Sequence, residues 1–268
     1  MTVPYQYIVA GLPDIIFDEQ KVDTRLHTLI QELKDQIPPG DADLLSYIGY
    51  PIDNRNLLIK LLHKNDPILQ FGNFSEEELE EEIKSPDLLP DYMQEYLAAY
   101  NDNTNIIQNL TWENQLYWLF FEHTSSLQNR FLNEWFTFEL NLRNILTAIK
   151  CRASKVPFEN HIICRNEVTA LIFKSNAPDF TLPSKISWAD DLFAMDFYSI
   201  ATSEEKLVRF RLQQLEDIAE VELFSIETIM QIAIALSLAE RWDLLDATAG
   251  KLKLEKIIDD LESSYKAE

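Results

Sequence analysis

The sequence predicts an all-α protein, a multi-helix bundle array of about a dozen helices, and three observations support this prediction. Apolar residues recur three and four positions apart along most of the 268 residues, which is typical of helices that bury one face. Sequence patterns that start helices precede several of these stretches. The chain has only five glycines, too few for a sheet whose strands are joined by tight hairpins.

The stretch 129–150 carries the strongest helical signal and is predicted to form one long central helix. Its apolar face consists of Phe131, Trp135, Phe138, Leu142, Ile145 and Ile149. A neighbouring row contains Glu139 and Arg143, an acid and a base four residues apart among apolar side chains. Because a helix this aromatic needs other helices to shield it from water, we expect it at the centre of a helical domain.

Before this helix, the chain is expected to begin with an extended or irregular segment and to continue as shorter helices. Residues 4–17 contain two prolines, a glycine and several β-branched or aromatic residues. An amphipathic helix at 22–36 is expected to end at the Pro38-Pro39-Gly40 sequence. Further helices are expected at 41–50, 53–64, 76–84, 88–100 and 112–123.

The helix at 76–84, with the sequence EEELEEEIK, is strongly acidic. Ser75 and Glu78 form a capping box at its start, and only Leu79 and Ile83 are apolar. Like charges at this density need water between them, so the acidic face is expected to be solvated. A docking site for a basic partner is the alternative.

After the long helix, more helices are expected with one linker between them. The segment 177–186 contains Pro178 and Pro183 and is the best linker candidate. It would separate an N-terminal helical region, 1–176, from a C-terminal helical region, 187–268, and the two are expected to form one compact unit. Helices are expected at 158–174, 187–198, 202–222 and 225–249, and in a final stretch after residue 250.

Short sequence signals mark the ends of the C-terminal helices. Thr202 and Glu205 form a second capping box, and Ser225 is placed to cap the following helix. The middle of that helix, 229–239, is apolar on all sides, so it is expected to be fully buried. Gly250 is expected to end it and to start a turn into an antiparallel last helix.

Charge and composition exclude several classes of function. The formal net charge is −22, with 45 acidic residues against 23 basic ones, and this charge repels nucleic acid and anionic lipid. Such a charge either confers solubility or suits a basic protein partner. The longest apolar run, 228–239, is too short to span a bilayer, which takes about 20 residues. With no signal sequence at its start, the chain is expected to be cytoplasmic, with no nucleic-acid partner and no direct membrane insertion.

No catalytic, cofactor or metal site is predicted, so the protein is not expected to be an enzyme. No nucleophile elbow and no phosphate-binding glycine loop is present. His161 and Cys164 would share a helical face and, with Cys151, would give three zinc ligands, but we find no fourth, and a core cysteine beside a partly buried histidine is the preferred interpretation. Glu139 and Arg143 form either an intrahelical ion pair or a catalytic acid held by arginine, and the ion pair is preferred because no third group is apparent.

Two blocks of the sequence resemble a known family. The first, FELNLRNILTAIKCR at 138–152, is similar to the central helix of the C-type subunit of V/A-type ATPases, whose eukaryotic V-ATPase counterpart is the d-type subunit. The second, at 224–258, resembles the C-terminal block of the same family, in which Glu-Arg-Trp precedes a glycine. The opening YQYIVAGLPD and the length are similar to an uncharacterised bacterial family encoded in V-type ATPase operons, and this resemblance covers the whole chain.

The resemblance implies a fold like that of the C-type subunit and a non-catalytic adaptor in the central stalk of a V/A-type ATPase. Such an adaptor couples the rotary shaft to the membrane ring that translocates ions, so it acts in ion transport without catalysing it. The implied partners are the central-stalk subunits and the membrane ring, and the implied location is cytoplasmic, peripheral to the inner membrane through a protein complex. A free-standing helical scaffold or assembly factor for the same ATPase is the alternative. The structural and interaction candidates are Trp135, Glu139, Arg143, Asn144, Glu240, Arg241 and Trp242.

Overall fold

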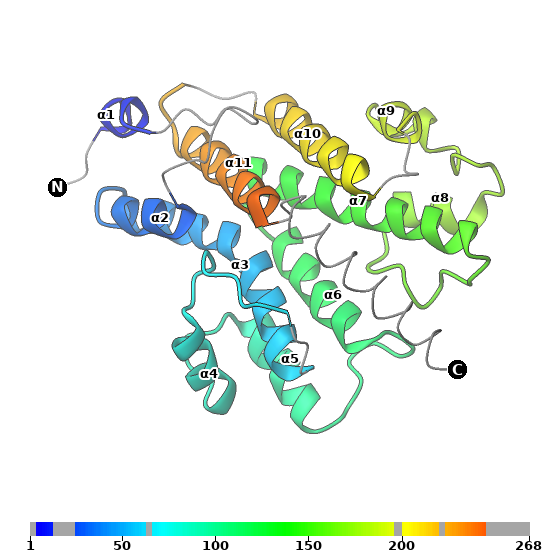
Figure 1. The fold of residues 1–268 in the computed structure, drawn as a ribbon, viewed down its shortest axis with the longest axis horizontal. Coiled ribbons are helices and arrows are strands. Elements are labelled where there is room, and N and C mark those ends of the chain that lie inside the picture. Colours follow the sequence, from blue (N-terminus) through cyan, green and yellow to red (C-terminus); the bar gives the residue numbers. More distant parts are fainter. Residues whose placement is uncertain (1–3, 13–24, 63–65, 196–199, 220–222, 245–268) are drawn as a thin grey trace, which may run out of the picture. The chain divides into compact units, whose positions relative to one another are not determined.

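The computed structural model describes residues 4–12, 25–62, 66–195, 200–219 and 223–244 of the chain. Eleven α-helices and one short 3-10 helix lie in these ranges, and no strand occurs within them, which confirms the predicted all-α fold (Figure 1). The chain divides into two compact units, one made of Met1–Ile48 and Met195–Glu268 and the other of Gly49–Ala194.

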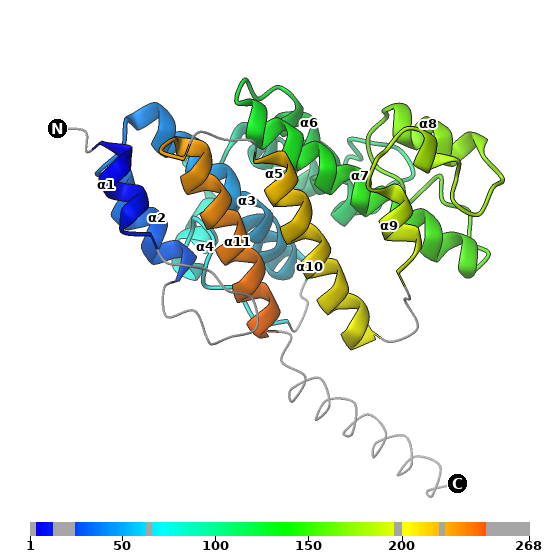
Figure 2. The same cartoon turned by 90° about the horizontal axis from the view of Figure 1, so that it is seen from above.

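The first unit is organised around one apolar helix, α11. In Figure 2 this helix lies between α10 on one side and α1 and α2 on the other, and it packs against all three. Ile229, Met230 and Ala233 of α11 are completely buried, but Ile232 and Leu238 are only partly buried, so the stretch 229–239 is not buried on all sides as predicted. The helices of this unit are α1 (Tyr5–Ala10), α2 (Leu26–Lys34), the first part of α3 (Pro39–Leu61), α10 (Ile200–Ile218) and α11 (Ile226–Leu244).

The second unit contains the long helix α7 (Arg130–Ala153), and this confirms the helix predicted at 129–150. Helix α7 packs against α6 and α8, and α6 also packs against α5 (Figure 1). Leu142 and Ile145 of the predicted apolar face are completely buried and Ile149 is partly buried, so most of this face forms part of the core. The remaining elements are α4 (Glu76–Lys84), α5 (Asp91–Asn101), α6 (Trp112–Ser125), α8 (Glu167–Lys174), the 3-10 helix Leu182–Ser184 and α9 (Ala189–Phe193).

Helix α3 is continuous where two helices, 41–50 and 53–64, were predicted. Pro51 lies inside it, although an interior proline removes a helical hydrogen bond and costs about 3 kcal/mol. The buried side chains Leu45, Ile48 and Ile52 lie on both sides of this proline. Their burial offsets the local cost, and the helix therefore runs through a residue that ends most helices.

The first described element is also helical, whereas an extended or irregular segment was predicted for 4–17. Pro4 directly precedes α1 with φ near −59° and ψ near 136°, so the helix begins only at the residue after this proline. Ile8 is buried, and the Tyr5 hydroxyl donates to the Asp41 carboxylate at the start of α3. Tertiary contacts therefore outweigh the low helix propensity of this segment. Residues 13–17 of the prediction lie outside the described residues.

The predicted helix starts have mixed outcomes. The capping box of Ser75 and Glu78 is present, with both hydrogen bonds formed, at 2.8 and 3.2 Å. Ser225 directly precedes α11, but its buried hydroxyl has no hydrogen-bond partner among the described residues, so the predicted cap is not formed. Thr202 is not a helix start, because α10 already begins at Ile200.

Helix α8 is shorter than the predicted 158–174. A capping box fixes its start at Asn166, whose side chain accepts a hydrogen bond from the backbone N–H of Thr169 at 2.9 Å. Residues 158–166 form an irregular loop with one turn at 159–161 instead. His161 and Cys164 therefore do not share a helical face, which was the basis of the zinc alternative.

The segment 177–186, predicted as a linker, lies inside the second unit. Phe180 and Leu182 are completely buried, and both Phe180 and Thr181 have left-handed backbone conformations with φ of 55° and 59°. Proline-rich sequence here marks a tightly packed loop. The borders between the two units fall at 48/49 and 194/195, and the first lies within helix α3.

Candidate functional site

Trp135 is a core residue of the second unit. Only 5% of its surface is exposed, and its ring centroid lies 5.4 Å from that of Phe138. Phe138 in turn contacts the Trp188 ring edge-on at 5.2 Å. Trp135 thus belongs to an aromatic cluster between α7 and the chain entering α9, and it stabilises the fold.

Arg143 connects α7 to α6. Its Nη2 donates to Asn114 Oδ1 at 3.0 Å, and its guanidinium carbon lies 4.1 Å from the centre of the Tyr117 ring. Stacking of a guanidinium on an aromatic face is a favourable contact that lysine reproduces poorly. Both of these partners of Arg143 lie on the neighbouring helix α6.

Asn144 holds the chain that follows α7. The amide is completely buried, and it donates to the Ile163 carbonyl at 2.8 Å while accepting from the Ile163 N–H at 3.0 Å. Both backbone groups of one loop residue are thus satisfied by one side chain. Unpaired buried backbone groups are costly, so this pair fixes the loop against the helix.

Arg152, at the end of α7, holds the next loop in a similar way. Its guanidinium donates to the carbonyls of Ala177 at 2.5 Å and Ser175 at 3.1 Å. It also lies 3.7 Å from the centre of the buried Phe180 ring. Arg152, the last residue of the block 138–152, therefore fixes the loop that contains the start of the predicted linker.

In the first unit, Glu240 bonds to the start of another helix. Glu240 is only 2% exposed, and its Oε1 accepts a hydrogen bond from the backbone N–H of Leu26, the first residue of α2, at 2.7 Å. Helix N-termini favour negative charge because their first N–H groups have no partner inside the helix. Arg241 next to it is exposed and Trp242 is half-buried.

The comparisons with known proteins identify a family. The family described as "Protein of unknown function (DUF2764)" matches residues 1–265.

The chain belongs to this family.

The resemblance to an uncharacterised family over the whole chain is thereby confirmed, whereas these comparisons give no link to the C-type subunit of V/A-type ATPases. No curated protein and no solved structure matches the chain.

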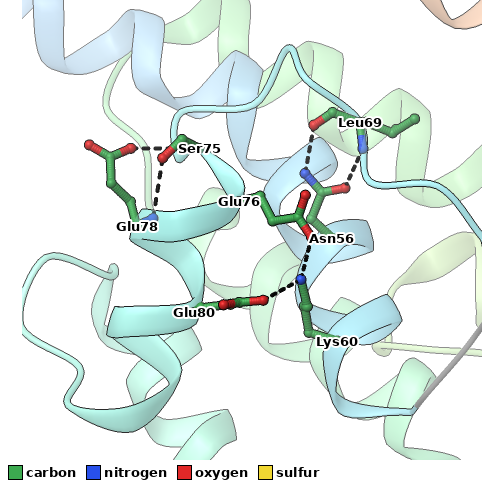
Figure 3. Close-up of polar contacts among 7 residues, drawn as sticks. All are labelled: Asn56, Lys60, Leu69, Ser75, Glu76, Glu78 and Glu80. Carbon is green, nitrogen blue, oxygen red and sulfur yellow. Dashed lines mark hydrogen bonds and ion pairs between the residues drawn. The ribbon is translucent and has the colours of Figure 1, made fainter.

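Further loops of this DUF2764 chain are held by polar side chains that the sequence did not single out. Asn56 of α3 pairs with both backbone groups of Leu69, at 2.9 Å each, and Figure 3 shows the amide facing that loop. Gln115 of α6 accepts from the Ile106 N–H at 2.7 Å and donates to the Leu110 carbonyl at 3.1 Å. Isolated amides in otherwise apolar helix faces are the only sequence signal for such contacts.

The acidic helix α4 is attached to α3 by a lysine. Lys60 Nζ lies 2.5 Å from a carboxylate oxygen of Glu76 and 2.6 Å from one of Glu80. Figure 3 shows the lysine pointing to both carboxylates. The hydrogen bond from Lys60 lowers the pKa of Glu80, and the bonds to Glu76 and Glu80 raise the pKa of Lys60. Glu77 and Glu81 are exposed, so the predicted solvated face is present on part of this helix.

Glu82 departs from the predicted solvated face because it is buried. Its Oε2 accepts from the backbone N–H groups of Asp87 at 2.8 Å, Leu88 at 2.8 Å and Leu89 at 3.2 Å. Burial acts to raise the pKa of Glu82, but these three hydrogen bonds outweigh it and hold the pKa below its ordinary value. The charged carboxylate therefore stabilises the turn between α4 and α5.

The chain has two cysteines, and neither lies on the surface. Cys151 and Cys164 are both buried, and burial raises the pKa of the Cys164 thiol to about 12. Among the residues that the structure describes, no three His, Cys, Asp or Glu side chains gather in a way that would hold a metal ion. None of the described helices is long and apolar enough to cross a membrane.

Proposed function

We propose that this DUF2764 protein is a non-catalytic adaptor in the central stalk of a V/A-type ATPase. In this role it couples the rotary shaft to the membrane ring that translocates ions. Its partners are the other central-stalk subunits and that ring, and it is cytoplasmic and peripheral to the inner membrane through the complex. The resemblance of 138–152 and 224–258 to the C-type subunit supports the proposal.

One structural observation favours a mechanical role for these two blocks. Their polar residues Asn144, Arg152 and Glu240 each hold a loop or a helix start through backbone groups. Buried hydrogen bonds of this kind restrict local motion, because opening one leaves polar groups without partners. An adaptor that transmits torque needs such internal stiffness, whereas a substrate site needs polar groups that converge on an open position.

Reconstituted vesicles that lack only this protein test the adaptor function. We expect ATP hydrolysis by the soluble head to remain largely intact while ATP-driven ion pumping is lost, because hydrolysis takes place on other subunits. Restoring the purified protein should restore pumping. Vesicles that pump at the normal rate per ATP hydrolysed without it would contradict the adaptor function.

The alternative proposal is a free-standing scaffold or assembly factor for the same ATPase. It has the same helical construction but leaves the complex after assembly. The copy number in the detergent-solubilised complex distinguishes the two: an adaptor is present once per mature complex, whereas an assembly factor is found only with incomplete complexes.

A further inference from the structure

The end of α7 and the adjacent helix α8 form a surface with exposed apolar side chains, which we call the α7–α8 surface (residues 150–174). Val156 is 43% exposed and Phe173 is 45% exposed. The rings of Phe158 and Phe173 contact each other with centroids 5.5 Å apart, so the two segments share this apolar area. Helix α8 packs directly beside α7 (Figure 1).

The charge of this surface is opposite to that of the whole chain. Residues 150–174 contain five lysines and arginines and two glutamates, whereas the chain has 23 basic and 45 acidic residues. Lys150, Lys155 and Lys174 are exposed, and within the described parts of the chain none of the three forms an ion pair. Lys155 and Lys174 directly adjoin the exposed Val156 and Phe173 in sequence.

The backbone at the end of α7 fixes the position of Lys155. The Val156 N–H donates to the Cys151 carbonyl at 2.9 Å and the Lys155 N–H to the Arg152 carbonyl at 3.2 Å, which is the hydrogen-bond pattern of a Schellman motif. Lys155 has φ of 57°, a left-handed conformation in which glycine is usual and a lysine is strained. The chain therefore keeps an exposed cation at a position that glycine would occupy with less strain.

We propose that the α7–α8 surface binds an acidic segment of a partner protein in the complex, with an apolar side chain of that segment seated against Phe173 and Val156. This inference rests on the proposed function, because the partner is taken to be a component of the V/A-type ATPase. Lysines that form no ion pair with the described residues, placed around an apolar centre, match a segment of alternating acidic and apolar residues. A protein partner is favoured over a membrane, because the net charge of −22 repels anionic lipid and the apolar area is small.

Charge reversal at this surface tests the inference. The double variant Lys155→Glu with Lys174→Glu is compared with a control double variant, Lys84→Glu with Lys206→Glu. The control residues are also exposed lysines and lie outside this surface, so both variants change the net charge equally. Detergent-solubilised ATPase depleted of this protein is titrated with the purified full chain, and the apparent Kd is measured. We expect the first variant to bind at least about tenfold more weakly and the control to stay within about twofold of wild type.

A second variant, Phe173→Ser, removes the apolar contact without altering charge and is expected to weaken binding as well. Circular dichroism first establishes that each variant keeps the helical content of wild type. If wild type binds and all variants bind equally well, the inference is overturned while the adaptor function stands. If wild type itself does not bind the ATPase, the adaptor function fails and the inference fails with it.

Two further outcomes would also overturn the inference by identifying a different occupant. In the first, wild type binds vesicles of anionic phospholipid and the Lys155→Glu, Lys174→Glu variant does not, while both bind the ATPase equally. In the second, sedimentation shows a self-associated wild type that the same variant converts to monomers, which would assign the surface to a second copy of the chain.

Discussion

At Asn144, one buried amide satisfies both the N–H and the carbonyl of Ile163, a residue 19 positions later in the chain. The sequence identified Asn144 as a candidate through a resemblance, but it did not identify what the side chain does. Asn56 and Gln115 have similar roles and were not identified at all. These amides bond to backbone N–H and carbonyl groups, which nearly every residue has. The sequence therefore contains no particular residue type that would identify their partners.

Replacement of Trp135 tests the core at the residue scale. Trp135→Ala is expected to lower the free energy of unfolding by about 3–5 kcal/mol, because it empties a large buried aromatic site. The measurement is chemical denaturation followed by circular dichroism. Tyr7→Ala serves as the control, since Tyr7 is 75% exposed and its loss should change the stability by less than about 0.5 kcal/mol. An unchanged denaturation midpoint for Trp135→Ala would show that this face of α7 is not core.

Individual elements were predicted well where amphipathic periodicity was strong and poorly where tertiary contacts decide. The long helix α7 and the capping box of α4 follow from local sequence alone. Helix α1 contacts Asp41, far away in sequence, and α3 continues through Pro51 with buried side chains on both sides of it. Local sequence patterns do not reveal tertiary packing. The sequence therefore predicted an extended segment at 4–17 and a helix break between residues 50 and 53.

The loop between α3 and α4 leaves no space for a side chain at Gly72. A Cβ atom there would lie 2.2 Å from Asp53 Oδ1, and this carboxylate also accepts a hydrogen bond from the Asn73 N–H at 2.9 Å. Gly72→Ala is therefore expected to destabilise the protein by about 1–3 kcal/mol, since either the loop or the carboxylate must move. Thermal or urea denaturation gives the value.

Gly40→Ala is the matched control for this loop. Gly40 lies in the first turn of α3, and a Cβ atom there would meet no atom within 4 Å. Alanine at this helical position is expected to stabilise by about 0.5–1 kcal/mol. Equal effects of the two substitutions would contradict the close packing of the loop on Asp53.

The turn after α4 should give the protein a dependence on acidic pH. Because the folded-state pKa of Glu82 lies below its ordinary value of 4.5, its stabilising effect is complete above that value and is lost as pH falls through the lowered pKa. Glu82→Gln lacks this contribution, so the stability difference between wild type and variant should shrink on acidification from neutral pH to below about 4. Urea midpoints at a series of pH values measure the difference. Glu81→Gln, at an exposed neighbour, is the control and should follow the wild-type curve.

At the scale of the whole molecule, the dominant property is a net charge of −22. In the proposed complex, charge complementarity should hold the protein to its partners, so added salt should weaken assembly. The screening length falls from about 10 Å at 0.1 M salt to about 3 Å at 1 M, which is shorter than most contacts between exposed charges. Co-purification of the protein with the ATPase across a salt series is the measurement, with helical content at each salt concentration as the control. Constant retention over the series would show that apolar contacts dominate the association.

The division into two units was the feature least accessible from sequence. Prolines at 178 and 183 indicated a linker, but the buried Phe180 between them fixes that segment inside the second unit. The border at residues 48/49 lies within a helix, where neither composition nor periodicity changes. Apolar periodicity therefore sufficed for the fold class, while the grouping of helices depends on long-range contacts.

The loops tied down by Asn56, Gln115 and Asn144 have a consequence for solvent exchange. Their backbone N–H groups at Leu69, Ile106 and Ile163 can meet deuterated water only after the side-chain pair opens, as a helical N–H must first leave its own bond. In a hydrogen–deuterium exchange experiment these three positions should retain their protons as long as the neighbouring helices do. Other loop amides, such as that of the exposed Asn160, should lose theirs within the first time points. These loop positions should therefore exchange as slowly as the helices to which they are hydrogen-bonded.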